Sequence, residues 1–185
     1  MRVVGGRLKG RNLASPSSND IRPTADRLRE SLFNILIHAY DDPIENARVL
    51  DLFAGTGALG LEALSRGAAH VTFVDMGAES RGLIRDHIEA FGAGGVTKLL
   101  RRDATDLGPA GSFGPFDLVF LDPPYGQGLG EQALAGLVAQ GWLAPGALLV
   151  FEESVTAEIE IPPGFTLDDR REYGAAALHF ITLSH

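Results

Sequence analysis

The stretch Asp51-Leu52-Phe53-Ala54-Gly55-Thr56-Gly57-Ala58-Leu59-Gly60 decides the fold. Apolar residues at 48–53 predict a buried strand, and helical spacing at 57–66 predicts a helix that ends at Gly67. The glycines between them permit positive φ and let a ligand approach the backbone closely. A strand, a glycine-rich turn and a helix in this order are typical of the first unit of a cofactor-binding α/β sheet.

Strands and helices alternate along the rest of the chain. Strands are expected at 48–53, 71–74, 98–100, 116–121 and 147–151, helices at 57–66, 78–91 and 131–140, and two last strands near 165–173 and 176–183. This alternation predicts an α/β fold with a mostly parallel sheet covered on both faces, and the final pair predicts an antiparallel edge.

A different region precedes this sheet. Residues 1–14 suggest two short strands, 2–4 and 11–13, around glycine-rich turns. A helix is expected to start at Pro23-Thr24, with Thr24 as its cap, and to end at 41–43. We therefore divide the chain into an extension at 1–45 and a cofactor-binding domain at 46–185.

Carboxylates follow or end the first three strands. Asp75 lies 20 residues after Gly55, which suits a carboxylate that binds ribose hydroxyls. Gly55-x-Gly57-x-x-Gly60 also fits the dinucleotide fingerprint, so a nicotinamide enzyme is an alternative. Asp51 favours S-adenosylmethionine, because a carboxylate there suits an ammonium group and would repel a pyrophosphate. Asp103 would contact an adenine edge. The alternatives are that Asp75 is a helix cap and that Asp103 forms a turn.

The fourth strand ends in Asp122-Pro123-Pro124-Tyr125. The prolines fix φ and donate no hydrogen bond, so the Pro123 carbonyl can face a ligand. Asp122 can accept a hydrogen bond from an amino group, and the Tyr125 ring can stack on a flat base. The group therefore predicts a grip on a planar exocyclic amine, as a nitrogen methyltransferase needs. The alternative is an ordinary turn after a strand.

Charge is distributed unevenly over the 185 residues. The net charge is −8, but residues 1–29 hold seven basic and two acidic side chains, and the remainder holds nine basic and 22 acidic ones. This predicts a basic arm that follows phosphates on an acidic body, or simply a solvated surface. With no cysteine and no paired histidine spacing, we expect no metal site. No apolar run is long enough for a membrane span and no signal peptide is evident, so a cytoplasmic protein is expected.

The chain resembles the family of bacterial 16S ribosomal RNA guanine-N2 methyltransferases that modify guanine 966. The resemblance covers nearly the whole chain. The segments that carry it are residues 2–6, Gly10-Arg11-Asn12-Leu13, Arg22-Pro23-Thr24 with Asp26-Arg27 and Arg29-Glu30, residues 32–34, residues 51–68 and Asp122-Pro123-Pro124-Tyr125. The glycine turn is common to many methyltransferases, whereas the arm and Arg22-Pro23-Thr24 are more specific to this family.

The resemblance implies a Rossmann-like class I methyltransferase fold of seven strands with an antiparallel last strand. It also implies S-adenosylmethionine as the methyl donor and a guanine of 16S ribosomal RNA, or of the assembling 30S particle, as the substrate of a monomeric enzyme. The expected catalytic residues are Asp122, Pro123, Pro124 and Tyr125. The expected cofactor-binding residues are Asp51, Phe53, Ala54, Gly55, Thr56, Gly57, Asp75, Met76, Asp103 and Ala104. The expected RNA-binding residues are Arg2, Arg7, Lys9, Arg11, Arg22, Thr24 and Arg27.

Three alternatives stay open at this point. An adenine-N6 methyltransferase acting on DNA or RNA uses the same tetrapeptide. A nicotinamide-dependent oxidoreductase fits the glycine turn alone. A non-catalytic RNA-binding protein that retains the cofactor fits the arm and the turn together.

Overall fold

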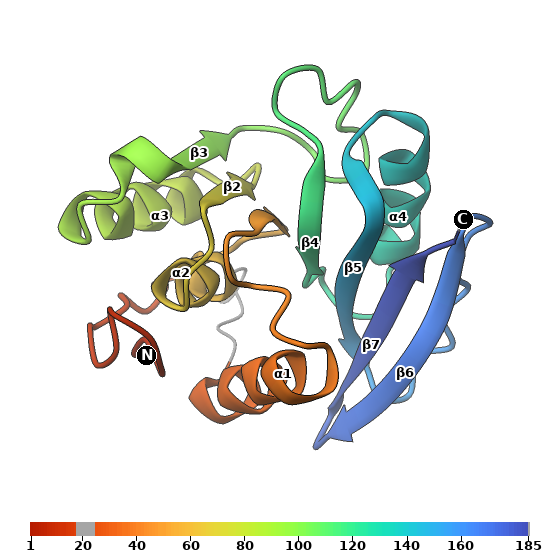
Figure 1. The fold of residues 1–185 in the computed structure, drawn as a ribbon, viewed down its shortest axis with the longest axis horizontal. Coiled ribbons are helices and arrows are strands. Elements are labelled where there is room, and N and C mark those ends of the chain that lie inside the picture. Colours follow the sequence, from red (N-terminus) through yellow and green to blue (C-terminus); the bar gives the residue numbers. More distant parts are fainter. Residues whose placement is uncertain (18–24, 185) are drawn as a thin grey trace.

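The computed structural model describes residues 1–17 and 25–184 (Figure 1). In this part of the chain seven strands form one sheet in the order β3-β2-β1-β4-β5-β7-β6. The strands are β1 (Arg48–Leu52), β2 (His70–Val74), β3 (Thr97–Leu100), β4 (Phe116–Leu121), β5 (Leu143–Ser154), β6 (Phe165–Tyr173) and β7 (Ala176–Leu183). The helices are α1 (Asp26–Ala39), α2 (Ala58–Ser65), α3 (Ala78–Ala90) and α4 (Leu129–Ala139), with a 3-10 turn at Gly94–Val96.

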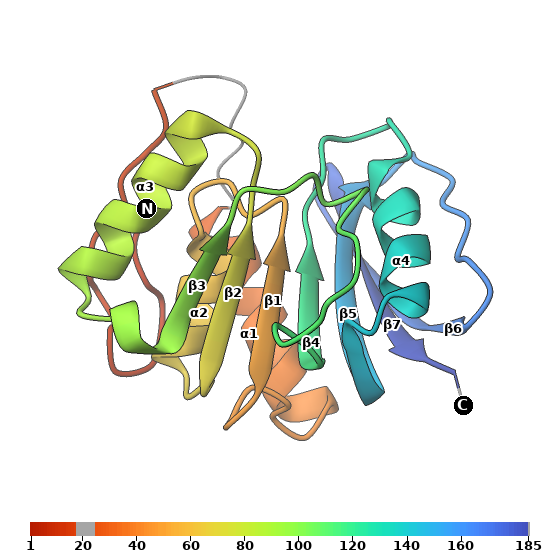
Figure 2. The ribbon, with the colours of Figure 1, turned by 90° about the horizontal axis from the view of Figure 1, so that it is seen from above.

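The sheet confirms the fold class expected from the sequence. Strands β1 to β5 pair in parallel, while β7 runs antiparallel to both β5 and β6. Strand β5 is much longer than expected, because it continues the pairing with β7 as far as Ser154. The strands form an open, twisted surface on which the carboxyl ends of β1 to β5 share one edge (Figure 2).

Apolar side chains cover both faces of the sheet. Helices α1, α2 and α3 pack on one face, and α4 packs on the other together with the segment 101–115 (Figure 1). Trp142 is fully buried on the α4 side, where its indole N–H donates to the Gly108 carbonyl at 2.8 Å. This bond satisfies the polar edge of a large buried ring.

The extension differs from the sequence expectation in two places. Instead of two strands, residues 1–14 contain one isolated antiparallel bridge between Arg2 and Asn12. The two segments are joined by three backbone hydrogen bonds, from the N–H groups of Val3, Gly10 and Leu13 to the carbonyls of Arg11, Val3 and Met1, and contacts with helices hold them to the rest of the protein. Helix α1 begins at Asp26 and not at Thr24, and the expected cap Thr24 lies outside the described residues. The proposed division at residue 45 stays a prediction.

The arm, residues 1–17, is fixed to α2 by hydrogen bonds. The buried Glu62 carboxylate accepts the Val4 and Gly5 backbone N–H groups at 2.8 and 2.9 Å. The Ser65 hydroxyl accepts from the Leu8 N–H at 2.9 Å. A Cβ at Gly6 would stand 2.0 Å from the Ser65 carbonyl oxygen, so only glycine allows this approach.

A charged cluster joins this arm to α1. The fully buried Arg29 guanidinium donates to the Arg2 carbonyl at 2.9 Å and to Glu62 at 3.2 Å, and it also pairs with Asp26. Arg66 donates to the other Glu62 oxygen at 2.8 Å. Glu62 is therefore the carboxylate that holds the arm, α1 and α2 together.

The change Glu62→Ala should destabilise the protein by about 3–5 kcal/mol, because it leaves a buried arginine and two backbone donors without their acceptor. Urea unfolding measures this loss. The control Glu172→Ala removes an exposed ion pair with Arg170 and should cost less than about 1 kcal/mol. Equal stability of the two variants would contradict the role given to Glu62.

Candidate active site

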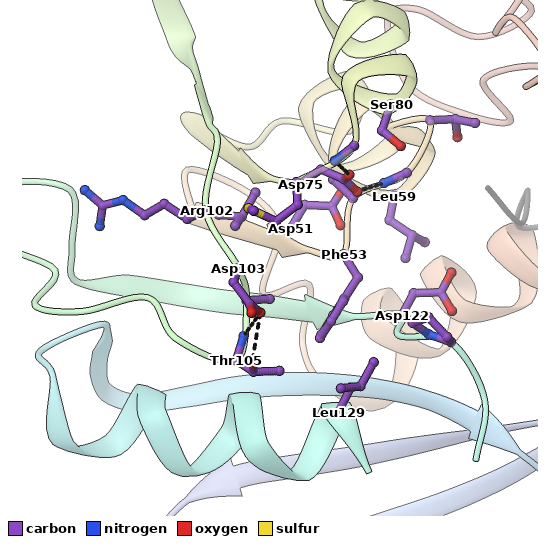
Figure 3. A pocket seen from close by; sticks show the side chains of 18 of the residues that line it. Asp51, Phe53, Leu59, Asp75, Ser80, Arg102, Asp103, Thr105, Asp122 and Leu129 are labelled. Carbon is purple, nitrogen blue, oxygen red and sulfur yellow. Dashed lines mark hydrogen bonds between the residues drawn. The ribbon is translucent and has the colours of Figure 1, made fainter. Parts of the chain in front are cut away.

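The strand order reverses between β1 and β4, and the main cavity lies at this point. In open α/β sheets, ligands bind outside the carboxyl ends of the strands where the order reverses. Here a cavity of about 650 Å³ is lined by the ends of β1 and β2, the turn before α2, the segment after β3 and the segment after β4. Figure 3 shows the Phe53 side chain between Asp103 and Asp122, with Asp75 above it and Leu129 of α4 below it.

Asp51 lies in the floor of this cavity at the end of β1. Its carboxyl group is 1% exposed and accepts the Gly60 N–H at 3.0 Å. A Cβ at Gly60 would stand 2.5 Å from the Phe73 ring, so a glycine is needed for α2 to approach the sheet. Burial raises the pKa of Asp51 to about 8, with a smaller increase from Asp75 and an opposing effect of the Gly60 hydrogen bond. The group is thus ready to ionise when a cation is placed beside it.

Phe53 begins the turn with a left-handed backbone, at φ 55°. Such a conformation costs a residue with a Cβ about 1–3 kcal/mol and is found mainly where the surroundings enforce it. The Ala54 N–H donates to the Val74 carbonyl at 3.1 Å, which ties this turn to β2. The strained backbone directs the Phe53 ring into the cavity (Figure 3).

Asp75 organises the rim above β2. Its two oxygens accept the backbone N–H groups of Gly55 at 2.9 Å and Gly77 at 2.8 Å. These bonds connect the glycine turn to the loop before α3. Each carboxylate oxygen retains a lone pair that can accept a ligand hydroxyl.

Asp103 lies after β3 on the opposite rim. One of its oxygens accepts both the backbone N–H and the hydroxyl of Thr105, at 2.9 and 2.7 Å. The Thr105 hydroxyl is the largest cause that lowers the pKa of Asp103 below its ordinary value, so this carboxyl group is ionised at neutral pH. Asp103 therefore does form a turn, as one of the sequence alternatives expected. The same hydrogen bonds fix its carboxylate at the edge of the cavity.

The tetrapeptide is fastened to β5 by two buried glutamates. The Tyr125 hydroxyl donates to Glu152 at 2.6 Å, and the Gly126 N–H donates to Glu153 at 2.9 Å. Asp122, Pro124 and Tyr125 line the cavity, whereas Pro123 is buried behind it. The Tyr125 ring is thus held by its hydroxyl at one side of the space next to Asp122.

Nearly all expected cofactor residues meet in this cavity. Gly57 is the exception, because it is buried as the residue before α2 and does not line the cavity. The cavity residues absent from the expected set are Ala58, Leu59, Val74, Gly77, Ser80, Arg102, Thr105 and Leu129, and Glu152 and Glu153 behind Tyr125 were also not expected. The sequence did contain a signal for the two glutamates, because they directly follow the apolar run at 147–151, which ends at the same edge of the sheet.

The expected RNA-binding residues are dispersed. Arg2, Arg7, Lys9, Arg11 and Arg27 are exposed, and Arg22 and Thr24 lie outside the described residues. The guanidinium of Arg11 donates to the Ala90 carbonyl at 2.8 Å and stacks over Phe91. The Arg7 N–H donates to the carbonyl of Ser65, which lies at the end of α2 away from the cavity. The eight residues of α2 span about 12 Å, so the two ends of this helix are about that far apart.

Arg27 is the expected RNA contact at the cavity edge of the sheet. It lines a second cavity of about 360 Å³ with Ser31, Tyr173 and neighbouring residues of α1 and the β6–β7 turn. Tyr173 pairs with Ala176, which pairs with Ser154 at the end of β5. This cavity therefore lies beside the strand end that holds Tyr125.

Within residues 1–17 and 25–184, no group of three or more His, Cys, Asp or Glu side chains could hold a metal ion. None of the helices in that part of the chain is long and apolar enough to span a membrane.

Comparison with known proteins identifies the family. A family model described as conserved hypothetical protein 95 matches residues 1–182. The chain belongs to this family. It is 39% identical to ribosomal RNA small subunit methyltransferase D of Escherichia coli K12, over 96% of this chain and 87% of that protein. It is 34% identical to the Haemophilus influenzae protein of the same name, over 90% and 86% of the two chains.

Structural comparison agrees. The solved structure of the Escherichia coli protein yhhF superposes with a TM-score of 0.84 and 34% identity, covering 99% of this chain and 97% of that one. The fold is that of Rossmann-like class I methyltransferases, and the family resemblance drawn from the sequence is confirmed. These relationships support a methyltransferase activity for this chain.

The buried Asp51 should make stability depend on pH in a predictable direction. The pKa of Asp51 in the folded protein, about 8, exceeds its ordinary value of 3.8. Its contribution to the free energy of unfolding is therefore complete below pH 3.8 and is lost as the pH rises through 8. The free energy of unfolding should therefore fall between about pH 4 and 8, by at most about 1.4 kcal/mol per pH unit from this group.

The change Asp51→Asn should flatten this decrease while keeping an acceptor for the Gly60 N–H. Denaturant unfolding at several pH values measures the slope. The control Asp103→Asn should leave the slope above pH 5 unchanged, because Asp103 is already ionised there. An identical pH dependence in Asp51→Asn and the unmodified protein would show that Asp51 is not the buried titrating group.

Proposed function

We propose that this chain transfers a methyl group from S-adenosylmethionine to the exocyclic N2 of a guanine in 16S ribosomal RNA. The observation that carries the proposal is the position of Asp122, Pro124 and Tyr125 on the wall of the switch-point cavity, which Asp51 and Asp75 also line. A cofactor site and an amine grip thus share one cavity. The names of the two relatives above favour small-subunit ribosomal RNA as the substrate.

The charges of the cavity fit a cationic cofactor. Four carboxyl groups line it, from Asp51, Asp75, Asp103 and Asp122. Arg102 also lines it, but its guanidinium donates to the Leu107 carbonyl at 3.0 Å and lies over the Phe113 ring. A sulfonium and an ammonium group are favoured in such surroundings, whereas the pyrophosphate of a nicotinamide cofactor is repelled. This balance of charge argues against the oxidoreductase that the glycine fingerprint alone allowed.

Each residue has a distinct role in this proposal. The ammonium group would lie near Asp51 and ionise it, and Asp75 would accept the ribose hydroxyls. Asp103 would accept from the adenine amino group, with Phe53, Met76 and Ala104 against the ring. Gly55 and Thr56 would supply the backbone that the cofactor approaches closely. Gly57, which does not line the cavity, would stabilise this turn before α2.

At the other end of the cavity, this chain's residues hold the base. Tyr125 stacks on the guanine, and the Asp122 carboxylate accepts a proton of its exocyclic amine. The Pro123 carbonyl, which does not line the cavity in the ligand-free structure, accepts the second proton once the base is bound. These hydrogen bonds aim the nitrogen lone pair, which is otherwise delocalised into the ring, at the methyl group. When bound, S-adenosylmethionine would supply an electrophilic methyl group, and the residues of this chain would hold the amine in line with it and leave the amine proton free to pass to water.

Hydrogen-bond acceptors near the tetrapeptide favour guanine over adenine. Guanine presents two adjacent donors, N1–H and the N2 amine, whereas adenine presents an acceptor at N1 beside its amine. Glu152 and Glu153 add two buried carboxyl groups behind Asp122 and Tyr125. Acceptor-rich surroundings would disfavour the adenine N1 and support the guanine substrate.

Methyl transfer should be detected with radiolabelled S-adenosylmethionine, offered with unmethylated 30S subunits, naked 16S ribosomal RNA and DNA in parallel. The labelled nucleoside should be N2-methylguanosine. Asp122→Ala should reduce kcat about 100-fold or more, since small misplacements of reacting atoms have effects of this size. Its affinity for S-adenosylhomocysteine should stay within about threefold, because the cofactor contacts remain.

The control for this variant is Glu158→Ala, which removes an exposed carboxylate outside the cavity and should retain full activity. Full activity of Asp122→Ala would refute the amine grip. Labelled N6-methyladenine in RNA or DNA would instead support the adenine-N6 alternative. Cofactor binding without any labelled product would support a non-catalytic RNA-binding protein.

Basic side chains of the arm should contribute to RNA affinity through phosphate contacts. The double change Arg7→Ala with Lys9→Ala should reduce the slope of log affinity against log salt by about 1.4, or about 0.7 per contact with single-stranded RNA. Filter binding between 50 and 200 mM salt measures this slope. Lys98→Ala removes an exposed charge on β3 and should leave the slope unchanged. An unaltered slope in the double variant would assign the arm to folding alone.

A further inference from the structure

His87 lies between the arm and the cofactor turn. It is on α3, and its side chain is 4% exposed. Its Nδ1 lies 3.1 Å from the Thr56 carbonyl oxygen, and its Nε2 lies 2.8 Å from the backbone nitrogen of Ala14. One imidazole ring thus contacts the glycine turn on one side and the arm on the other.

The two partners fix the state of the ring. A backbone N–H can only donate, so Nε2 must present its lone pair to Ala14. A carbonyl can only accept, so Nδ1 must carry the proton toward Thr56. Burial lowers the pKa of His87, although the Thr56 hydrogen bond and Asp86 oppose this change, and the ring is neutral at neutral pH. A single neutral tautomer therefore satisfies both bonds.

Other contacts make the arm follow the whole of α3. Arg11 donates to the carbonyl of Ala90 at the end of the helix. The Ser17 N–H and hydroxyl both donate to Glu79 in its first turn, at 2.7 and 2.6 Å. Glu79 precedes Ser80, which lines the cofactor cavity. The arm thus leads from the far end of the molecule to the cavity edge, with His87 on the way.

We propose that His87 is a positioning residue that couples the arm to the cofactor turn, so that cofactor bound at Thr56 and RNA bound on the arm tighten each other's binding. If the arm moves, the buried Nε2 loses its donor, and the ring that fixes the Thr56 carbonyl is no longer held. The role of RNA rests on the function proposed above, but the link between the arm and the cofactor does not. Coupling of this kind is reciprocal between the two ligands.

The test removes the arm's bond without touching the helix or the cavity. Ala14→Pro removes the one backbone N–H that donates to Nε2 of His87. The residue before it, Leu13, already lies in the extended part of the arm, where its N–H donates to the Met1 carbonyl at 2.9 Å. Isothermal titration with S-adenosylhomocysteine should show affinity reduced about fivefold or more, the lower end of measured couplings. The control Ser15→Ala changes an exposed arm side chain next to Ala14 and keeps the Ala14 N–H, and it should bind this ligand as the unmodified protein does.

A smaller reduction in folded Ala14→Pro, or an equal reduction in Ser15→Ala, would overturn the proposal. A melting curve establishes whether Ala14→Pro is folded. If it is not, hydrogen exchange of the unmodified protein decides: saturating S-adenosylhomocysteine should slow exchange of the Ala14 amide, and no slowing would overturn the coupling.

A second measurement separates this proposal from the function itself. In the unmodified protein, saturating 16S ribosomal RNA should raise the affinity for S-adenosylhomocysteine about fivefold or more, and in Ala14→Pro this gain should disappear. A gain retained in Ala14→Pro would overturn the role of His87. Absence of RNA binding would refute the proposed substrate, while the titrations without RNA would still test the link.

Discussion

The reversal of strand order between β1 and β4 is the constraint on which the rest of this molecule depends. Neighbouring parallel strands diverge there into helices on opposite faces, so no crossover covers their carboxyl ends. Asp51 ends one of these strands and Asp122 follows the other. Asp51 and Asp122 lie about 70 residues apart in the chain, and under the proposed function the cofactor site and the amine grip to which they belong consequently meet in one cavity.

Much of this arrangement could be predicted because it is local. The glycine turn, Asp75 and Asp103 each follow a strand directly, and parallel strands bring their carboxyl ends to one edge whatever the details of packing. The antiparallel last strand was likewise expected from two adjacent strand patterns at the chain's end. Here, local sequence and global topology agree, as is usual for a well-specified fold.

The parts that could not be predicted depend on contacts between distant segments. No periodicity shows that the backbone of residues 4 and 5 will meet a glutamate 57 or 58 positions later, or that a histidine on α3 will accept from Ala14. The arm was expected to form strands, because its short apolar runs fit that pattern. Its two segments do pair through a few backbone hydrogen bonds, but other backbone donors of the arm are satisfied by side chains of α2 and α3, so the pairing does not extend into strands.

The carboxyl groups around the main cavity have a further consequence for turnover. Under the proposed function, the donor carries a positive sulfonium that becomes an uncharged thioether once the methyl group has left. The same side chains therefore attract the fresh donor more strongly than the spent one. An acidic cavity thus favours exchange of spent for fresh cofactor, and it does so without any movement of the chain.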